Sequence, residues 1–206
     1  MFEGEYLNEK RWNGRRMCRL KDKFIQENIK YEVEILKGKL WNGKIYDSNN
    51  NIICDWKEGK GFIKEYNDYG ELRFEGEYLN GERHGKGKEY EDFEGNIKFE
   101  GEYLYGCKRK GRSYMNGVLE YEGEYLYGKK YNGKGYDEKG NIIYELKNGN
   151  GTIKEYDYYN HLMYEGEYLN RERNGKGKEY YYRGNLIFEG EYLNGKEWNG
   201  KKFYDF

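Results

Sequence analysis

The segment Phe74-Glu75-Gly76-Glu77-Tyr78-Leu79 sets the repeat of this chain. Close copies of it begin at Phe2, Phe99, Tyr121, Tyr164 and Phe188. Degenerate copies begin at Tyr31, Cys54 and Tyr144. Nine units result, starting at residues 2, 31, 54, 74, 99, 121, 144, 164 and 188, with spacings of 20 to 29 residues. A period of this length is typical of arrays in which each supersecondary unit buries its apolar face against the next.

Each full unit is expected to form two short strands. In the first strand, Phe74, Gly76 and Tyr78 share one face, because side chains alternate along a strand. The glycine is expected to leave room for a ring from a neighbouring strand. Residues 80–84 are rich in turn formers and predict a loop, and residues 85–90 predict the second strand, whose lysines face the glutamates of the first.

A longer period overlies the repeat. Residues 31–120 and 121–206 form a duplicated block of four units, and residues 74–90 match residues 164–180 at 14 of 17 positions. In the units at 54 and 144 the loop is deleted, which leaves Glu58-Gly59 and Asn148-Gly149 as tight hairpin turns. We expect these short tips to leave notches in the edge of the sheet. No linker composition interrupts residues 1–206, so one continuous array is predicted.

At this level of detail the units resemble MORN repeats. Residues 121–135 show the pattern of an aromatic, a strand glycine, a second aromatic and a later Gly-x-Gly. The resemblance covers nearly the whole chain. It departs from the pattern at Val33, Trp56, Leu146, Ile45, Arg112 and Lys201. The resemblance implies an all-β, elongated, twisted, single-layer array of about nine stacked hairpins. It also implies a scaffold role with protein partners, dimerisation or membrane apposition, and no catalytic residues.

The composition supports an all-β chain and narrows its function. The chain has 30 Gly and 26 Tyr but neither Ala nor Pro, which disfavours a helix-rich domain. Its 37 Lys+Arg balance 38 Asp+Glu, whereas nucleic-acid binders usually carry a basic excess, so no nucleic-acid partner is expected. The start resembles no secretory signal, and Cys18, Cys54 and Cys107 include no CxxC pair. We therefore expect reduced thiols and a cytoplasmic location, with membrane or cytoskeletal association as a further option.

No residue pattern supports catalysis, a cofactor or a metal. Glutamate pairs such as Glu75 and Glu77 recur in six units, whereas a catalytic pair is singular. Gly123-to-Lys129 and Gly190-to-Lys196 match part of a phosphate-binding loop but lack its Ser/Thr. His84 and His161 have no clustered Cys or Asp at metal-ligand spacing.

Three surfaces are candidates for binding. The first is an aromatic row, which could instead form the thin core of the array by stacking between units. The second is a basic patch in the longest interval between units, suited to anionic lipid or to being a solvated loop. The third is an aromatic C-terminal end, suited to a symmetric homodimer or to folding back. The aromatic row comprises Tyr78, Tyr103, Tyr125, Tyr168 and Tyr192, preceded by Tyr6; the basic patch comprises Arg15, Arg16, Arg19, Lys21 and Lys23; the C-terminal end comprises Trp198, Phe203, Tyr204 and Phe206.

The sequence thus predicts a non-enzymatic protein-interaction scaffold with an unknown protein partner. One alternative is a peripheral module that binds anionic lipid headgroups. A further alternative is a carbohydrate- or choline-binding repeat protein, since aromatic cages attract quaternary ammonium groups. The missing secretory signal disfavours the last of these.

Overall fold

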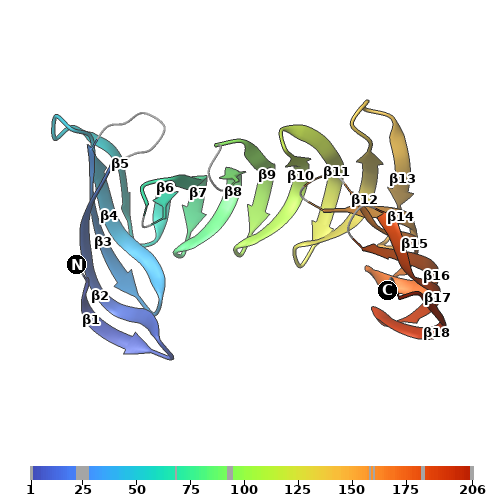
Figure 1. Cartoon of the computed structure of the whole chain (residues 1–206). Helices are drawn as coiled ribbons and strands as arrows, with labels where there is room; N and C mark the ends of the chain where they lie inside the picture. The colour runs from blue at the N-terminus through green and yellow to red at the C-terminus, as the bar shows by residue number, and fades with distance from the viewer. Residues whose placement is uncertain are drawn as a thin grey trace. The chain divides into compact units, whose positions relative to one another are not determined.

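The chain forms β-hairpins throughout (Figure 1). The computed structural model describes residues 2–21, 28–67, 69–91, 95–157, 159, 161–181 and 184–204, without the side chains of residues 17–21 and 28. Two compact units are present, residues 1–107 and residues 108–206. Eighteen strands and no α-helix occur in the described residues, so the predicted all-β stacked hairpin array is confirmed.

The strands follow one another in chain order within each unit. Unit 1 holds β1 (Phe2–Leu7), β2 (Lys10–Lys21), β3 (Asn28–Leu36), β4 (Lys39–Tyr46), β5 (Ile52–Lys57), β6 (Lys60–Tyr66), β7 (Leu72–Leu79), β8 (Glu82–Tyr90) and β9 (Ile97–Leu104). Unit 2 holds β10, which begins at its boundary (Cys107–Met115), β11 (Val118–Leu126), β12 (Lys129–Tyr136), β13 (Ile142–Leu146), β14 (Gly151–Tyr156), β15 (Leu162–Leu169), β16 (Glu172–Tyr181), β17 (Asn185–Leu193) and β18 (Lys196–Lys202). Consecutive strands pair antiparallel, and β13 and β14 are joined by a single bridge between Lys147 and Asn150.

The turns of the long hairpins differ from the prediction. Residues 80–84 do not form a loop: Asn80 and Gly81, with φ of 54° and 71°, make a two-residue turn, and β8 begins at Glu82. Two successive positive φ values give the turn whose twist matches that of the flanking strands. The short hairpins turn in the same way, at Glu58-Gly59 and Asn148-Gly149. Long and short hairpins therefore differ in strand length rather than in loop length.

Neighbouring tips bond to the tip of each short hairpin, where notches were expected. In unit 1, the Gly59 amide donates to Trp41 O at 2.7 Å, and the Gly81 amide donates to Gly59 O at 2.9 Å. In unit 2, the Gly149 amide donates to Tyr131 O at 2.8 Å, and the Arg171 amide donates to Gly149 O at 2.9 Å. An ion pair joins the two flanking long hairpins in each unit, Lys39 to Glu82 at 2.8 Å and Lys129 to Glu172 at 3.0 Å. These bonds tie the tips together, and in unit 2 a groove remains beside the short hairpin.

The core consists of rings lying over glycines. A Cβ added at Gly76 would lie 2.7 Å from Phe74 Cζ and 2.6 Å from Gly87 Cα. The ring thus covers Gly87 from the neighbouring strand, as predicted, and it also covers Gly76 on its own strand. Only a side chain reduced to hydrogen leaves this space, which offsets the conformational cost of glycine in a strand. Rings from the adjacent strand also cover Gly43 and Gly135, and these rings belong to Trp56 and Tyr144.

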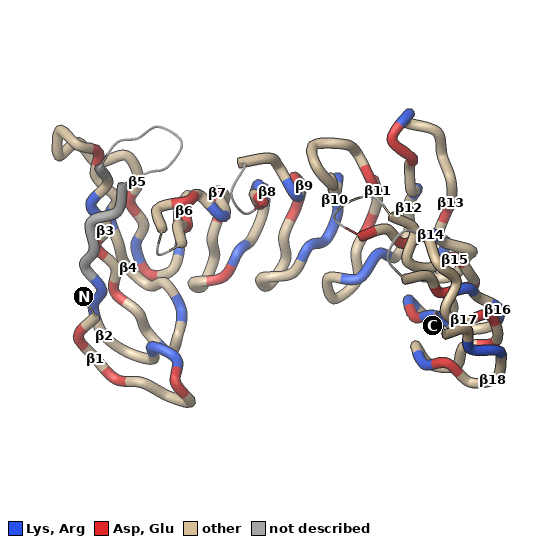
Figure 2. The backbone as a smooth tube through the Cα atoms, viewed as in Figure 1, with Lys and Arg blue, Asp and Glu red and all other residues tan. Residues whose placement is uncertain are grey.

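Acidic and basic residues both recur along the hairpins (Figure 2). As predicted, lysines of one strand lie beside glutamates of the next: Glu75 pairs in register with Lys88, and Glu165 with Lys178. The ammonium of Lys178 lies 3.2 Å from the carboxylate of Glu189 on the following strand. Exposed pairs of this kind contribute about 0.2–1 kcal/mol each, so they tune the array and do not hold it together.

Candidate interaction surfaces

The predicted aromatic row lies mainly in the core. Tyr78, Tyr103, Tyr125 and Tyr192 are 7%, 3%, 8% and 3% exposed, and Tyr168 is half-buried. Tyr103 packs edge-to-face on Phe74, with ring centroids 5.2 Å apart. Tyr6 alone of this row is largely exposed, at 60%. Tyr192 packs edge-to-face on Tyr164 in the same way, so these second rings join their unit to the preceding one, which is the core role considered above.

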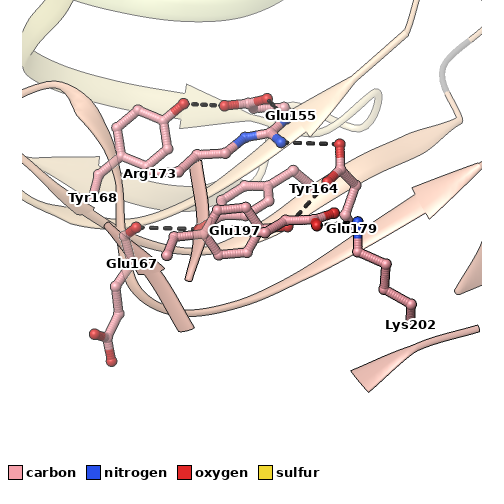
Figure 3. Close-up of polar contacts among 9 residues, drawn as sticks. Glu155, Tyr164, Glu167, Tyr168, Arg173, Glu179, Glu197 and Lys202 are labelled. Atoms are coloured by element: carbon pink, nitrogen blue, oxygen red, sulfur yellow. Dashed lines mark hydrogen bonds and ion pairs between the residues drawn. The ribbon is translucent and has the colours of Figure 1, made fainter. Parts of the chain in front are cut away.

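An arginine cluster lies over this ring core in unit 2 (Figure 3). Arg173 projects from β16 so that its guanidinium carbon lies 4.2 Å from the centroid of the Tyr164 ring. It donates to Glu155 at 2.6 Å and to Glu179 at 3.1 Å. The Tyr168 hydroxyl donates to Glu155, and the Tyr192 hydroxyl donates to Glu179 at 3.0 Å. One cation thus holds two carboxylates, each of which also accepts a hydrogen bond from a core tyrosine.

Unit 1 repeats this cluster. The Arg83 guanidinium lies 4.1 Å from the Phe74 ring centroid and donates to both oxygens of Glu65, at 3.0 and 2.9 Å. The Tyr78 hydroxyl donates to Glu65, and the Tyr103 hydroxyl donates to Glu89 at 3.4 Å. Because both copies carry it, we interpret the cluster as part of the packing of the array rather than as a site of its own.

The electrostatics agree with a packing role. Burial opposes the charge on Arg173, but the hydrogen bonds that it donates to Glu155 and Glu179, with the negative charge of these groups, outweigh burial and raise the arginine pKa. Burial, together with the neighbouring Glu155, raises the pKa of Tyr168. Burial also raises the pKa of Tyr164, to about 12. All three groups are thereby fixed in their neutral-pH ionisation state, whereas a proton-transfer catalyst needs a pKa near the working pH.

A row of leucines is exposed on the long hairpins. Each ends the first strand of its hairpin, next to the tight turn, and points to the opposite face from the residue before it, which is a tyrosine in every case but Leu36. Their exposed fractions run from 36% to 47%. The row comprises Leu7, Leu36, Leu79, Leu104, Leu126, Leu169 and Leu193. Within each unit the leucines thus recur at the hairpin tips rather than being scattered singly.

A groove lies within unit 2, beside the short hairpin of β13 and β14. Its volume is about 530 Å³. Its floor includes the buried side chains of Leu146 and Ile153. Four cationic side chains line it, together with two carboxylates, Tyr168 and the next hairpin tip. The cations are Lys129, Lys130, Arg171 and Arg173, and the carboxylates are Glu155 and Glu172.

The sequence analysis did not find the arginine cluster or this groove. A signal for the cluster exists, since Arg83 and Arg173 occupy equivalent positions in the duplicated block, three residues after the tight turn begins. A signal for the groove also exists, in the positions at which the two blocks differ. Neither could be assigned before the hairpin register was known, because the partner residues lie 6 to 43 residues away in the chain.

Most of the predicted basic patch lies on a strand. Arg15, Arg16, Arg19 and Lys21 belong to β2, which pairs with β3, whereas Lys23 lies outside the described residues. Arg15 is exposed and contacts Glu34 at 3.0 Å. The solvated loop considered for this interval is therefore replaced by strand as far as Lys21.

The predicted C-terminal aromatic end is exposed where it is described. Trp198, Phe203 and Tyr204 are 70%, 40% and 73% exposed, and Phe206 lies outside the described residues. The Phe203 amide donates to Ile187 O at 2.9 Å, which fixes the backbone there without covering the ring.

Other chemistry has little support in the part of the chain that the structure describes. No group of three or more His, Cys, Asp or Glu side chains is placed there to hold a metal ion. No helix among these residues has the length and hydropathy to cross a membrane. Cys54 is buried, and burial raises the pKa of its thiol, whereas Cys107 is exposed. No known family model matches this chain, and no curated protein matches it either.

Proposed function

We propose that this chain is a non-enzymatic protein-interaction scaffold built of MORN-like repeats. The observation that carries the proposal is the leucine row, which presents an apolar side chain at 36–47% exposure on seven hairpins. Apolar surface left at the edge of a sheet favours a protein partner, since burying it gains about 25 cal/mol per Å².

The contrast between long and short hairpins supports this proposal. Trp56 and Leu146 pair with Gly43 and Gly133. The short hairpins turn directly after the next residue, Lys57 or Lys147, and so lack the leucine position. The leucine position is therefore present on the hairpins that extend further.

The alternatives receive less support. Four rings of the aromatic row are buried, namely those of Tyr78, Tyr103, Tyr125 and Tyr192. They therefore offer little of the open aromatic surface that a sugar or choline would use. Anionic lipid binding through the basic patch has Arg15 in its favour, but this side chain already contacts Glu34. Both alternatives remain proposals of lower rank.

The test replaces three leucines of unit 2, Leu126, Leu169 and Leu193, by serine. Cross-linked proteins are captured from the source cells with three tagged proteins: the whole chain, its triple variant and a control variant. The control carries Val118→Ser and Ile142→Ser, two residues that are also exposed but begin their strands, at the opposite end from the leucine row. We expect proteins retained by the parent and the control to be lost by the triple variant, at unchanged melting temperature. Capture of the same proteins by all three would contradict the proposal.

A symmetric homodimer through the C-terminal unit is a second proposal. It is supported by the exposure of Trp198 and Tyr204, at 70% and 73%. Light scattering on the parent and on a variant lacking residues 203–206 tests it. We expect a dimer that the deletion converts to a monomer, and a parent that is already monomeric at high micromolar concentration would contradict it.

A further inference from the structure

The groove in unit 2 differs in charge from the equivalent positions of unit 1. Three substitutions account for the difference. Lys130 stands where unit 1 has Leu40, Arg171 where it has Gly81, and Leu146 where it has Trp56. The first two add cations, and the third replaces a bulky ring by a smaller side chain. The equivalent positions of unit 1 include two cations, Lys39 and Arg83, and two carboxylates, Glu65 and Glu82. The lining therefore has a net charge of zero there and of +2 in unit 2.

Three of the four groove cations already contact carboxylates. Lys129 lies 3.0 Å from Glu172, and Lys130 lies 2.5 Å from Glu120. Arg173 lies between Glu155 and Glu179. These pairs fix the lysines and the arginine in position, but they also neutralise much of their charge.

Arg171 is the exception among the four. Its guanidinium donates one hydrogen bond, at 2.9 Å, to the backbone carbonyl of Leu126, and it lies 5.8 Å from the exposed Tyr127 ring. Neither contact neutralises its charge. A guanidinium has five N–H donors, so most of them stay available to a ligand in the groove. The carbonyl bond and the neighbouring ring hold the side chain at the mouth of the groove, which lowers the entropic cost of binding.

Arg171 also occupies a backbone position that disfavours a large side chain. Its φ is 70°, and Gly81 adopts 71° at the same place in unit 1. A bulky residue in this region carries a conformational cost that asparagine or glycine largely avoids. Arginine therefore does not stabilise the turn itself. Any favourable effect of Arg171 comes from the contacts of its side chain.

We propose that the groove of unit 2 binds the phosphate group of a small anionic ligand, with Arg171 as the main contact and Lys130, whose ammonium also contacts Glu120, as a weaker second cation. Arginine pairs with phosphate through two parallel hydrogen bonds, and a nearby ammonium adds charge without imposing geometry. The groove volume of about 530 Å³ lies in the range of small-molecule sites. This inference does not depend on the proposed scaffold function, because none of the leucines of the row lines the groove.

The test uses the residues of unit 1 as replacements. The whole chain is titrated calorimetrically with inorganic pyrophosphate, as are the Arg171→Gly and Arg171→Gly/Lys130→Leu variants. Glycine suits the φ of position 171, so the single variant should fold as the parent does. Because Arg171→Gly removes both parallel hydrogen bonds to the phosphate, we expect binding to weaken by roughly a hundredfold or more. The control is Lys60→Leu, which removes an exposed cation of unit 1 and should leave binding unchanged.

A second arm separates a soluble ligand from a lipid headgroup. Vesicles of phosphatidylcholine, with and without phosphatidylserine, are sedimented with the parent and the double variant. Binding to phosphatidylserine vesicles that the double variant loses would support the site and identify a membrane as the source of the phosphate. The proposal is overturned if the double variant binds pyrophosphate or vesicles as tightly as the parent does. It is equally overturned if the parent shows no saturable binding to either.

Discussion

The hairpins of residues 74–90 and 164–180 share 14 of 17 residues, yet they sit beside different surfaces. In both hairpins an arginine lies over the first aromatic ring of the unit. Arg83 lies 4.1 Å from the centroid of Phe74, and Arg173 lies 4.2 Å from the centroid of Tyr164. They differ at Phe74 and Tyr164, at Gly81 and Arg171, and at His84 and Asn174. The first change leaves the ring buried, and the second adds a cation to the groove. The residues that the copies share thus build the array, and one that differs alters what its edge can bind.

The largest effect should follow removal of the covering ring. Each of the substitutions Phe74→Ala and Tyr164→Ala uncovers two glycines and leaves a cavity. We expect each to lower the free energy of unfolding by about 3–5 kcal/mol, the usual cost of removing a buried aromatic ring. Urea unfolding followed by circular dichroism measures the loss of free energy in both variants. If one copy tolerates the change and the other does not, the two rings do not have the same role.

The arginine clusters should contribute less but equally. Each of the substitutions Arg83→Met and Arg173→Met leaves carboxylates without their cation. The side chains of these ion pairs are 21–31% exposed. Partial exposure screens the pair, so we expect a loss of about 1–3 kcal/mol rather than the full cost of breaking a buried pair. A double-mutant cycle of Arg173→Met with Glu155→Gln isolates the coupling. Additive losses in that cycle would show that the ion pair does not stabilise the fold.

The difference between Phe74 and Tyr164 predicts a difference at alkaline pH. Burial raises the pKa of Tyr164 to about 12, against about 10 in an unfolded chain. The unfolded state therefore loses its proton first, so the stability from this group is complete below pH 10 and falls as the pH rises towards 12. Tyr164→Phe, which installs the residue of the other copy, should change little at neutral pH and should reduce the loss of stability above pH 10. Unfolding at a series of pH values checks this, and an unchanged alkaline profile would show that Tyr164 is not protected by burial.

The sequence predicted the repeat better than its contacts. The spacing of Phe74, Gly76 and Tyr78 was enough to assign one buried face, because strand periodicity is local. The sequence could not decide whether Asn80-Gly81 forms a tight turn or part of a longer loop. That depends on the pairing of Glu82 with Leu79, which is known only once the strands are placed. The bonds from Gly81 and Arg171 to the short tips were missed for the same reason. The groove required both the register and the comparison of the two copies.

The central claim is that rings lying over glycines hold the hairpins together, and one substitution tests it most directly. A Cβ at Gly166 would lie 2.6 Å from Gly177 Cα and 2.7 Å from Lys176 O, and backbone atoms cannot yield as a side-chain end can. We predict that Gly166→Val lowers the free energy of unfolding by about 1–3 kcal/mol or more through overpacking. Gly128→Asn is the matched control, since no atom lies within 4 Å of its added Cβ and asparagine tolerates a φ of 76°, so a change within about 0.5 kcal/mol is expected. A Gly166→Val protein that unfolds at the same urea concentration as the parent would contradict the account.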